Sequence, residues 1–303
     1  MKRWPVILAL TVPSIMLIPA TAFAHDGHHH PAALSLTLDP WIVTPLVIIA
    51  LLYGQGQRKL GHRSRRGQRR LARSSLSFWS GWSVLTFALV SPLHELGERL
   101  FSMHMIEHEL IMALAAPLMV LSRPLALILW GLPRTARALC AKVVGSRPLR
   151  STWSRLTGGT LATFLHGMAI WAWHAPPLFD AAVTNIGLHR LQHLSFFLSA
   201  LIFWWAVLWS ANRGMAVWHL FVTMMHMSLL GALITLAPDV RYQFATRDAS
   251  AWGMTPLEDQ QIAGLIMWVP AGIVYAGAAL ALMALWIHNS AKGGPDGTQA
   301  AHH

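Results

Sequence analysis

The chain has 303 residues, of which 54% are hydrophobic and only 12% are charged, and its mean hydropathy is +0.46. A soluble globular protein carries about 25% charged residues, so this chain lacks the polar surface of a water-soluble domain. The composition predicts an integral membrane protein. The net charge of +11 does not indicate nucleic-acid binding, because the basic residues are grouped between apolar runs, where membrane topology explains them. The single cysteine, Cys140, excludes an intramolecular disulfide.

The first residues have the pattern of a secretory signal peptide. Two basic residues precede an apolar run over 6–18, and an A-x-A cleavage pattern follows at 22–24. The alternative is an uncleaved first membrane helix, but Pro13 and Pro19 interrupt a run that is already short for a span of about 20 residues. Residues 1–24 are therefore predicted to be removed.

After cleavage the chain would begin with a His-rich periplasmic leader, residues 25–35. Neutral imidazole is a good ligand for Cu(II), Zn(II) or Ni(II), so this leader is a candidate accessory metal site. The alternative is a disordered polar segment without a metal. The imidazoles in question belong to His25, His28, His29 and His30.

Apolar windows of membrane-spanning length predict an all-α protein, a bundle of seven transmembrane helices within residues 36–288. The fourth window is the shortest. The windows are approximately 36–54, 76–93, 105–122, 159–173, 190–209, 216–237 and 261–288.

The charged residues predict the orientation of this bundle. Alternate loops hold 17 of the 21 basic residues that follow the signal peptide, and the other side holds 11 of the 12 acidic residues. Basic loops stay in the cytoplasm, so the N-terminus is expected outside and the C-terminus inside, with residues 289–303 as a cytoplasmic tail. The expected location is the bacterial plasma (inner) membrane, as a multi-pass protein in the lipid bilayer.

With this topology, six histidines from four spans fall near the external surface. Residues four apart share a helix face, so two of the histidine pairs can each present two ring nitrogens to one metal ion. Polar groups in a bilayer are costly and usually functional, and the sequence therefore predicts a metal site, although single intramembrane histidines are commonly structural. The six are His94, His104 with His108, His174, and His189 with His193.

Further side chains extend this candidate site. Glu107 can orient a ring as a neighbour of the ligands, and Met105 and Met267 add thioether sulfur near the same level. His166 and His226 lie deeper and are candidates for a path inward. Imidazole with thioether and no external thiolate suits copper better than magnesium or calcium. Zinc is an alternative metal, and the sequence does not distinguish Cu(I) from Cu(II).

Several function classes lack support. The four lysines lie outside the predicted spans, so no retinal Schiff base forms in the bundle. The sequence has no GxxxxGK[ST], GxSxG or HExxH motif. The protein is therefore expected not to be an enzyme.

Three stretches resemble the CtaG family of cytochrome c oxidase assembly factors. The resemblance covers roughly residues 36–288 and implies a seven-span protein that helps to build the haem-copper oxidase, with copper as its cargo. The stretches are Ser91-Pro92-Leu93 through His104-Met105 and His108 to Ala116-Pro117-Leu118; Trp173-His174-Ala175-Pro176 with His189 and His193; and Trp252-Gly253, Asp259-Gln260-Gln261, Gly264, Met267-Trp268 and Pro270.

The resemblance also assigns polar positions at the outer face. It implies His104, His108, His174, His189, His193 and Asp259. This chain has His94 and Glu107 where the family often has Asp and Gln, so those two are candidates from spacing alone.

The leading hypothesis is a non-enzymatic assembly factor that binds copper outside the membrane and delivers it to an oxidase copper centre. The expected partners are cytochrome c oxidase subunits and other copper chaperones. The alternatives are a haem-binding electron-transfer protein, since His pairs also ligate haem iron, a metal permease, and a scaffold that acts without metal.

Overall fold

The computed structural model describes residues 35–63 and 67–292, and within these ranges the chain forms helices and no β-strand. The all-α prediction is therefore confirmed for this part. The predicted signal peptide and almost all of the leader, with His25, His28, His29 and His30, lie outside the described residues, as does the tail from residue 293. The last helix continues to Lys292, past the predicted end of the bundle at 288.

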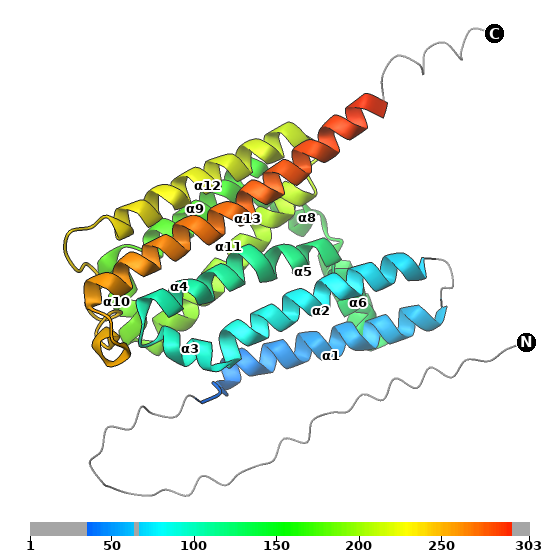
Figure 1. Ribbon diagram of the computed structural model, residues 1–303. Coiled ribbons are helices and arrows are strands. Elements are labelled where there is room, and N and C mark those ends of the chain that lie inside the picture. The colour runs from blue at the N-terminus through cyan, green and yellow to red at the C-terminus, as the bar shows by residue number, and fades with distance from the viewer. Residues whose placement is uncertain (1–34, 64–66, 293–303) are drawn as a thin grey trace, which may run out of the picture. The chain divides into compact units, whose positions relative to one another are not determined.

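Each predicted window overlaps one long helix (Figure 1). Four of these helices are long and apolar enough to cross a membrane, with spans over Phe101–Ser122, Ile186–Leu208, Arg213–Thr235 and Pro256–Ser290. The fourth window corresponds to a helix of only 15 residues, so the count of seven spans stays a prediction. The helices are α1 (Pro40–Arg63), α2 (Gln68–Val90), the continuous α4 (Phe101–Glu109), η1 (Leu110–Ala115) and α5 (Ala116–Ser122), α9 (Gly159–Trp173), α11 (Ile186–Leu208), α12 (Arg213–Thr235) and α13 (Pro256–Lys292).

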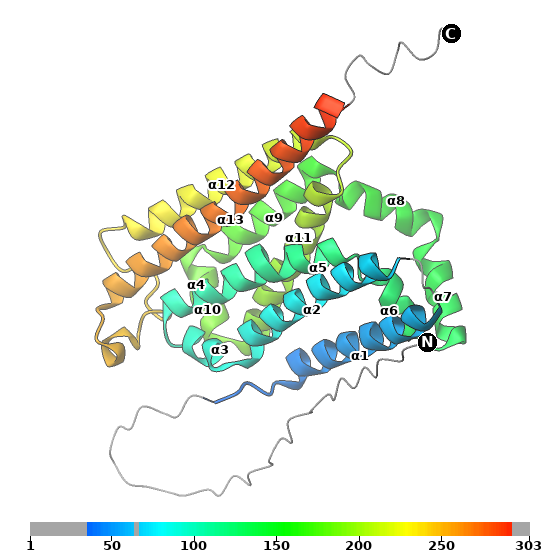
Figure 2. The same cartoon turned by 45° about the vertical axis from the view of Figure 1, so that its right-hand side comes forward.

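Short helices lie at the two ends of the bundle (Figures 1 and 2). One end carries α3 (Pro92–Gly97), α10 (Pro176–Thr184) and η2 (Ala249–Trp252), and we call it the histidine end. The opposite end carries α6 (Leu125–Gly131), α7 (Arg134–Val144) and α8 (Arg147–Leu156). The charged residues of α7 and α8 are all arginine or lysine, so we call this the basic end.

The third long helix contains a π-helical segment, η1. At its end the Ala116 N–H donates to the carbonyl of Ile111, five residues back. Pro117 follows directly; it has no N–H, and its ring would clash with the carbonyl four residues earlier in a regular α-helix. The wider π turn accommodates this proline while the helix remains continuous from Phe101 to Ser122.

The start of the described chain is tied to the histidine end. The backbone N–H and hydroxyl of Ser35 donate to Glu95 Oε2 at 2.7 and 3.0 Å. These hydrogen bonds lower the pKa of the Glu95 carboxyl. Arg190 Nε lies 2.8 Å from Asp39 Oδ2, which joins the start of α1 to α11.

Close backbone contact joins α12 to α13. A Cβ placed on Gly264 would lie 2.6 Å from the carbonyl oxygen of Gly231, and one on Gly231 would lie 2.8 Å from that of Gly264. Helices in lipid associate through such small residues, because the backbones can approach closely. Gly272, on the same helix, has nothing within 4 Å of the corresponding position.

We expect Gly264→Ala to separate α12 from α13 and to lower the free energy of unfolding by about 1–3 kcal/mol. Gly272→Ala, the matched control, should leave stability unchanged or slightly higher, because alanine favours helix. The apparent melting temperature in detergent measures both. Equal melting temperatures for the two variants would contradict this account of the α12–α13 contact.

Candidate functional site

The pair His104 and His108 lies on α4 and points into the histidine end. The two ring centroids are 4.3 Å apart, and both side chains are almost completely buried. His104 Nδ1 donates to the Gly97 carbonyl at 3.1 Å. This bond holds the ring with its Nε2 free to act as a ligand.

The second pair comes from α11 and faces the first. His193 has its ring centroid 5.2 Å from that of His108, and His189 lies 5.3 Å from His104. The Nε2 atoms of His189 and His193 are 2.6 Å apart. Two lone pairs at this distance would repel, so one of these nitrogens carries a proton and donates it to the other.

Glu107 and His94 complete the arrangement. His94 Nδ1 donates to Glu107 Oε1 at 2.6 Å, and the same oxygen lies 3.8 Å from His193 Nε2. The carboxylate is fully buried, so it contacts His94 and His193 away from bulk water. A carboxylate in this position orients imidazole rings and accepts their protons.

Among the described residues, these side chains form two groups whose ligand atoms lie close enough together to hold a metal ion. In each group one ligand atom per residue lies within 4.8 Å of all the others, and every member is buried. His193 belongs to both groups, which makes them one continuous cluster. The first group is His94, Glu107, His189 and His193, and the second is His104, His108 and His193; we call their union the histidine cluster.

Several polar atoms of the histidine cluster have no hydrogen-bond partner within the described ranges. They include His104 Nε2, both ring nitrogens of His108, and His193 Nδ1. A buried polar atom without a partner costs about 1–3 kcal/mol, and here several lie together. A metal ion coordinated by these nitrogens would remove this cost, so the donor set fits such an ion.

His174 and Met105 line the cluster from the side. His174 Nδ1 donates to the Ile170 carbonyl at 2.7 Å, and its Nε2 lies 3.4 Å from Met105 Sδ. The ring centroids of His174 and His108 are 6.0 Å apart. The Tyr242 hydroxyl donates to the His174 carbonyl at 2.6 Å, and burial raises the pKa of Tyr242, which keeps that donor protonated.

Asp259, a candidate from the resemblance, is hydrogen-bonded to the start of α4. Its two oxygens accept hydrogen bonds from the backbone N–H groups of Phe101 and Ser102, at 2.8 and 3.0 Å. The carboxylate thus caps the start of α4 from α13 and is absent from both ligand groups. It positions His104 through the helix that carries it.

The deeper candidates lie outside the histidine cluster. His166 contacts Ser199 Oγ at 3.0 Å and Tyr275 Oη at 3.3 Å. His226 packs against Gly167, where a Cβ would lie 3.3 Å from its Nε2. Met267 is a buried core residue of α13. The structure thus brings together six of the predicted positions and places these three elsewhere.

Two residues at the site escaped the sequence analysis. Gln192 is completely buried on α11 between the two histidines, and neither of its amide atoms has a hydrogen-bond partner in the part of the chain that the structure describes. Glu98 Oε1 lies 3.9 Å from His189 Nδ1 at the surface of the site. The sequence could have indicated Gln192, because an amide between two histidines is unusual in an apolar helix. Glu98 is brought to the site only by the turn between α3 and α4.

The chain matches the family described as cytochrome c oxidase caa3 assembly factor (Caa3_CtaG) over residues 51–289. It belongs to this family. The match confirms the resemblance seen in the sequence, and it includes every member of the histidine cluster. No solved structure matches the chain.

Curated relatives of this family member come from mycobacteria and are described as uncharacterized proteins. One from Mycobacterium leprae is 27% identical over 70% of this chain and 34% of its own length. Others from Mycobacterium bovis and Mycobacterium tuberculosis are each 25% identical over 84% of this chain and 40% of their own length. The chain thus spans between one third and two fifths of these relatives.

We expect Asp259→Ala to lower the apparent melting temperature, because two buried N–H groups lose their acceptor at about 1–3 kcal/mol each. Asp259→Asn, which keeps one acceptor oxygen, should lose less. The exposed Asp239→Ala is the matched control and should melt like the parent. A parental melting temperature in Asp259→Ala together with lost metal binding would instead indicate that this carboxylate is a ligand.

Proposed function

We propose that this assembly factor binds copper in the histidine cluster and delivers it to a copper centre of cytochrome c oxidase. The observation that carries the proposal is the set of buried ring nitrogens without partners, contributed by α4 and α11 and facing one another. Such an arrangement is costly in an apolar bundle unless an ion occupies it.

The ligand chemistry favours copper as the cargo. Imidazole binds copper well, and the Met105 thioether beside His174 suits Cu(I). Because His193 belongs to both ligand groups, an ion can pass between them by exchanging one ligand at a time. Transfer by ligand exchange breaks no covalent bond, and we therefore propose a non-enzymatic role.

We further propose seven spans with the histidine end outside the plasma membrane. The basic helices α7 and α8 lie at the opposite end, where the positive-inside rule expects the cytoplasm (Figure 2). This orientation places the copper cargo on the outer side. The proposed partners are oxidase subunits that carry a copper centre and copper chaperones that supply the ion.

The predicted His-rich leader fits this scheme as a capture segment. Ser35 is hydrogen-bonded to Glu95, the neighbour of His94, so the described part of the chain begins beside the histidine cluster. Ser35 follows His30 by five positions, a stretch of chain that reaches at most about 18 Å when fully extended. We propose that the leader captures copper ions that then pass to the histidine cluster.

The haem alternative is less compatible with this geometry. The rings of the histidine cluster lie with centroids 4.3 to 5.7 Å apart, and Phe179 and Phe196 pack against His108. A haem held by two of these imidazoles would have to insert its flat macrocycle between side chains that already touch. A small ion needs no such space.

We expect the double variant His104→Ala, His108→Ala to bind copper at least about 100-fold more weakly than the parent, because it removes direct ligands. His219→Ala, a buried histidine bonded to Thr163 away from the cluster, is the control and should bind normally. Metal content after anaerobic copper exposure, with an optical spectrum for haem, measures the effect. Parental copper binding and oxidase maturation in the double variant would support the scaffold alternative, and a Soret band the haem alternative.

Deletion of residues 25–30 tests the leader separately. We expect the shortened protein to retain the tightly bound copper of the membrane cluster, because none of its proposed ligands is removed. Copper loading at low metal concentration should become slower. Loss of all bound copper on deletion would place the functional site in the leader and would contradict the cluster as the binding site.

A further inference from the structure

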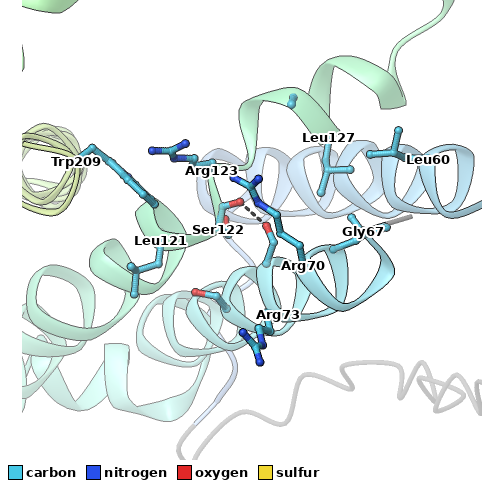
Figure 3. Close-up of a pocket in the computed structure, with 13 residues that line it drawn as sticks. Leu60, Gly67, Arg70, Arg73, Leu121, Ser122, Arg123, Leu127 and Trp209 are labelled. Atoms are coloured by element: carbon cyan, nitrogen blue, oxygen red, sulfur yellow. Dashed lines mark hydrogen bonds between the residues drawn. The ribbon is translucent and has the colours of Figure 1, made fainter. Parts of the chain in front are cut away.

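A pocket at the basic end lies between the ends of α1, α2, α5, α6 and α11. It is open to the surface and has a volume of about 590 Å³, in the usual range of small-molecule sites. Its apolar lining includes Leu60, Leu71, Leu127 and Trp209. Figure 3 shows Arg70 reaching from α2 towards the turn formed by Ser122 and Arg123.

Three arginines line this pocket and are exposed: Arg70, Arg73 and Arg123. None of them forms an ion pair with a carboxylate in residues 35–63 or 67–292. The sequence explains why, since it has no aspartate or glutamate at positions 40–94 or 110–179. These guanidinium groups are therefore not neutralised by a carboxylate of the described chain and can bind an anion.

The pocket is held in shape by contacts that leave the guanidinium groups available. Ser74 Oγ donates to the Ser122 carbonyl at 2.5 Å, and Ser77 Oγ donates to that of Leu118 at 2.6 Å, which joins α2 to α5. Arg123 adopts a left-handed backbone conformation with φ of 48°. Its guanidinium lies 3.4 Å from the centroid of the Trp209 ring, a cation–π contact that fixes the group at the rim.

We propose that this pocket binds an anionic phospholipid. Guanidinium groups bind phosphate oxygens with two parallel hydrogen bonds, and Arg70 and Arg123 are placed to hold the headgroup phosphate. An acyl chain would lie against Leu60, Leu71 and Leu127. Basic pockets between membrane helices at the cytoplasmic surface recognise lipids in this way, and the basic helices α7 and α8 follow directly from α6.

The binding test uses the full chain purified in detergent and native mass spectrometry with added dioleoyl phosphatidylglycerol. We expect one lipid to remain bound to the parent protein. The double variant Arg70→Gln, Arg123→Gln should bind it at least about tenfold more weakly, because each arginine near a lipid phosphate contributes measurably. The charge-matched control Arg69→Gln, Arg134→Gln, which changes two arginines outside the pocket lining, should bind like the parent.

Two further arms identify the ligand. Ala126→Trp fills the pocket without removing a charge, and it should weaken lipid binding to a similar extent while the protein stays folded. Neither inorganic phosphate nor dioleoyl phosphatidylcholine should displace the bound lipid at equal concentration. Displacement by inorganic phosphate would make the site one for a free anion, and equal binding of phosphatidylcholine, or parental binding in the pocket variants, would overturn the proposal.

Discussion

The hydrogen bonds from the α4 N-terminus to Asp259 are the interaction on which the histidine end depends. In an apolar bundle, the first N–H groups of a helix need an acceptor, because there is no water to supply one. Asp259 supplies it from α13, with both oxygens engaged. The negative carboxylate also favours the positive end of the α4 dipole. This contact fixes the height and rotation of α4, and with them His104 and His108.

The path of α4 into the bundle depends on a second local feature. A regular helix from Phe101 to Ser122 would bring the ring of Pro117 against the carbonyl of Ala113. The π segment η1 removes this conflict while the helix stays continuous. Such π segments frequently occur at functional sites, and here the segment begins one residue after Glu109, directly beside the buried residues of the histidine cluster.

The two ends of the molecule carry different kinds of polar groups that lack partners among the described residues. At the histidine end, neutral donors and one buried carboxylate converge with too few partners inside the described chain. At the basic end, arginines surround an apolar pocket without a carboxylate among the described residues. The first arrangement favours a metal cation and the second a phosphate anion.

The sequence by itself determined the helical class, the positions of the long helices, the family and the pairs at i and i+4. Lipid-compatible composition and the 3.6-residue period require little more than local information. The tertiary structure decided which pairs meet: it made His193 a member of both ligand groups, turned Asp259 into a cap for α4, and gave His166 the partners Ser199 and Tyr275. The sequence could not decide this, because helical spacing defines a face without defining which helix it contacts. Side-chain partners between distant segments depend on helix rotation and crossing, which only the packing of the whole bundle sets.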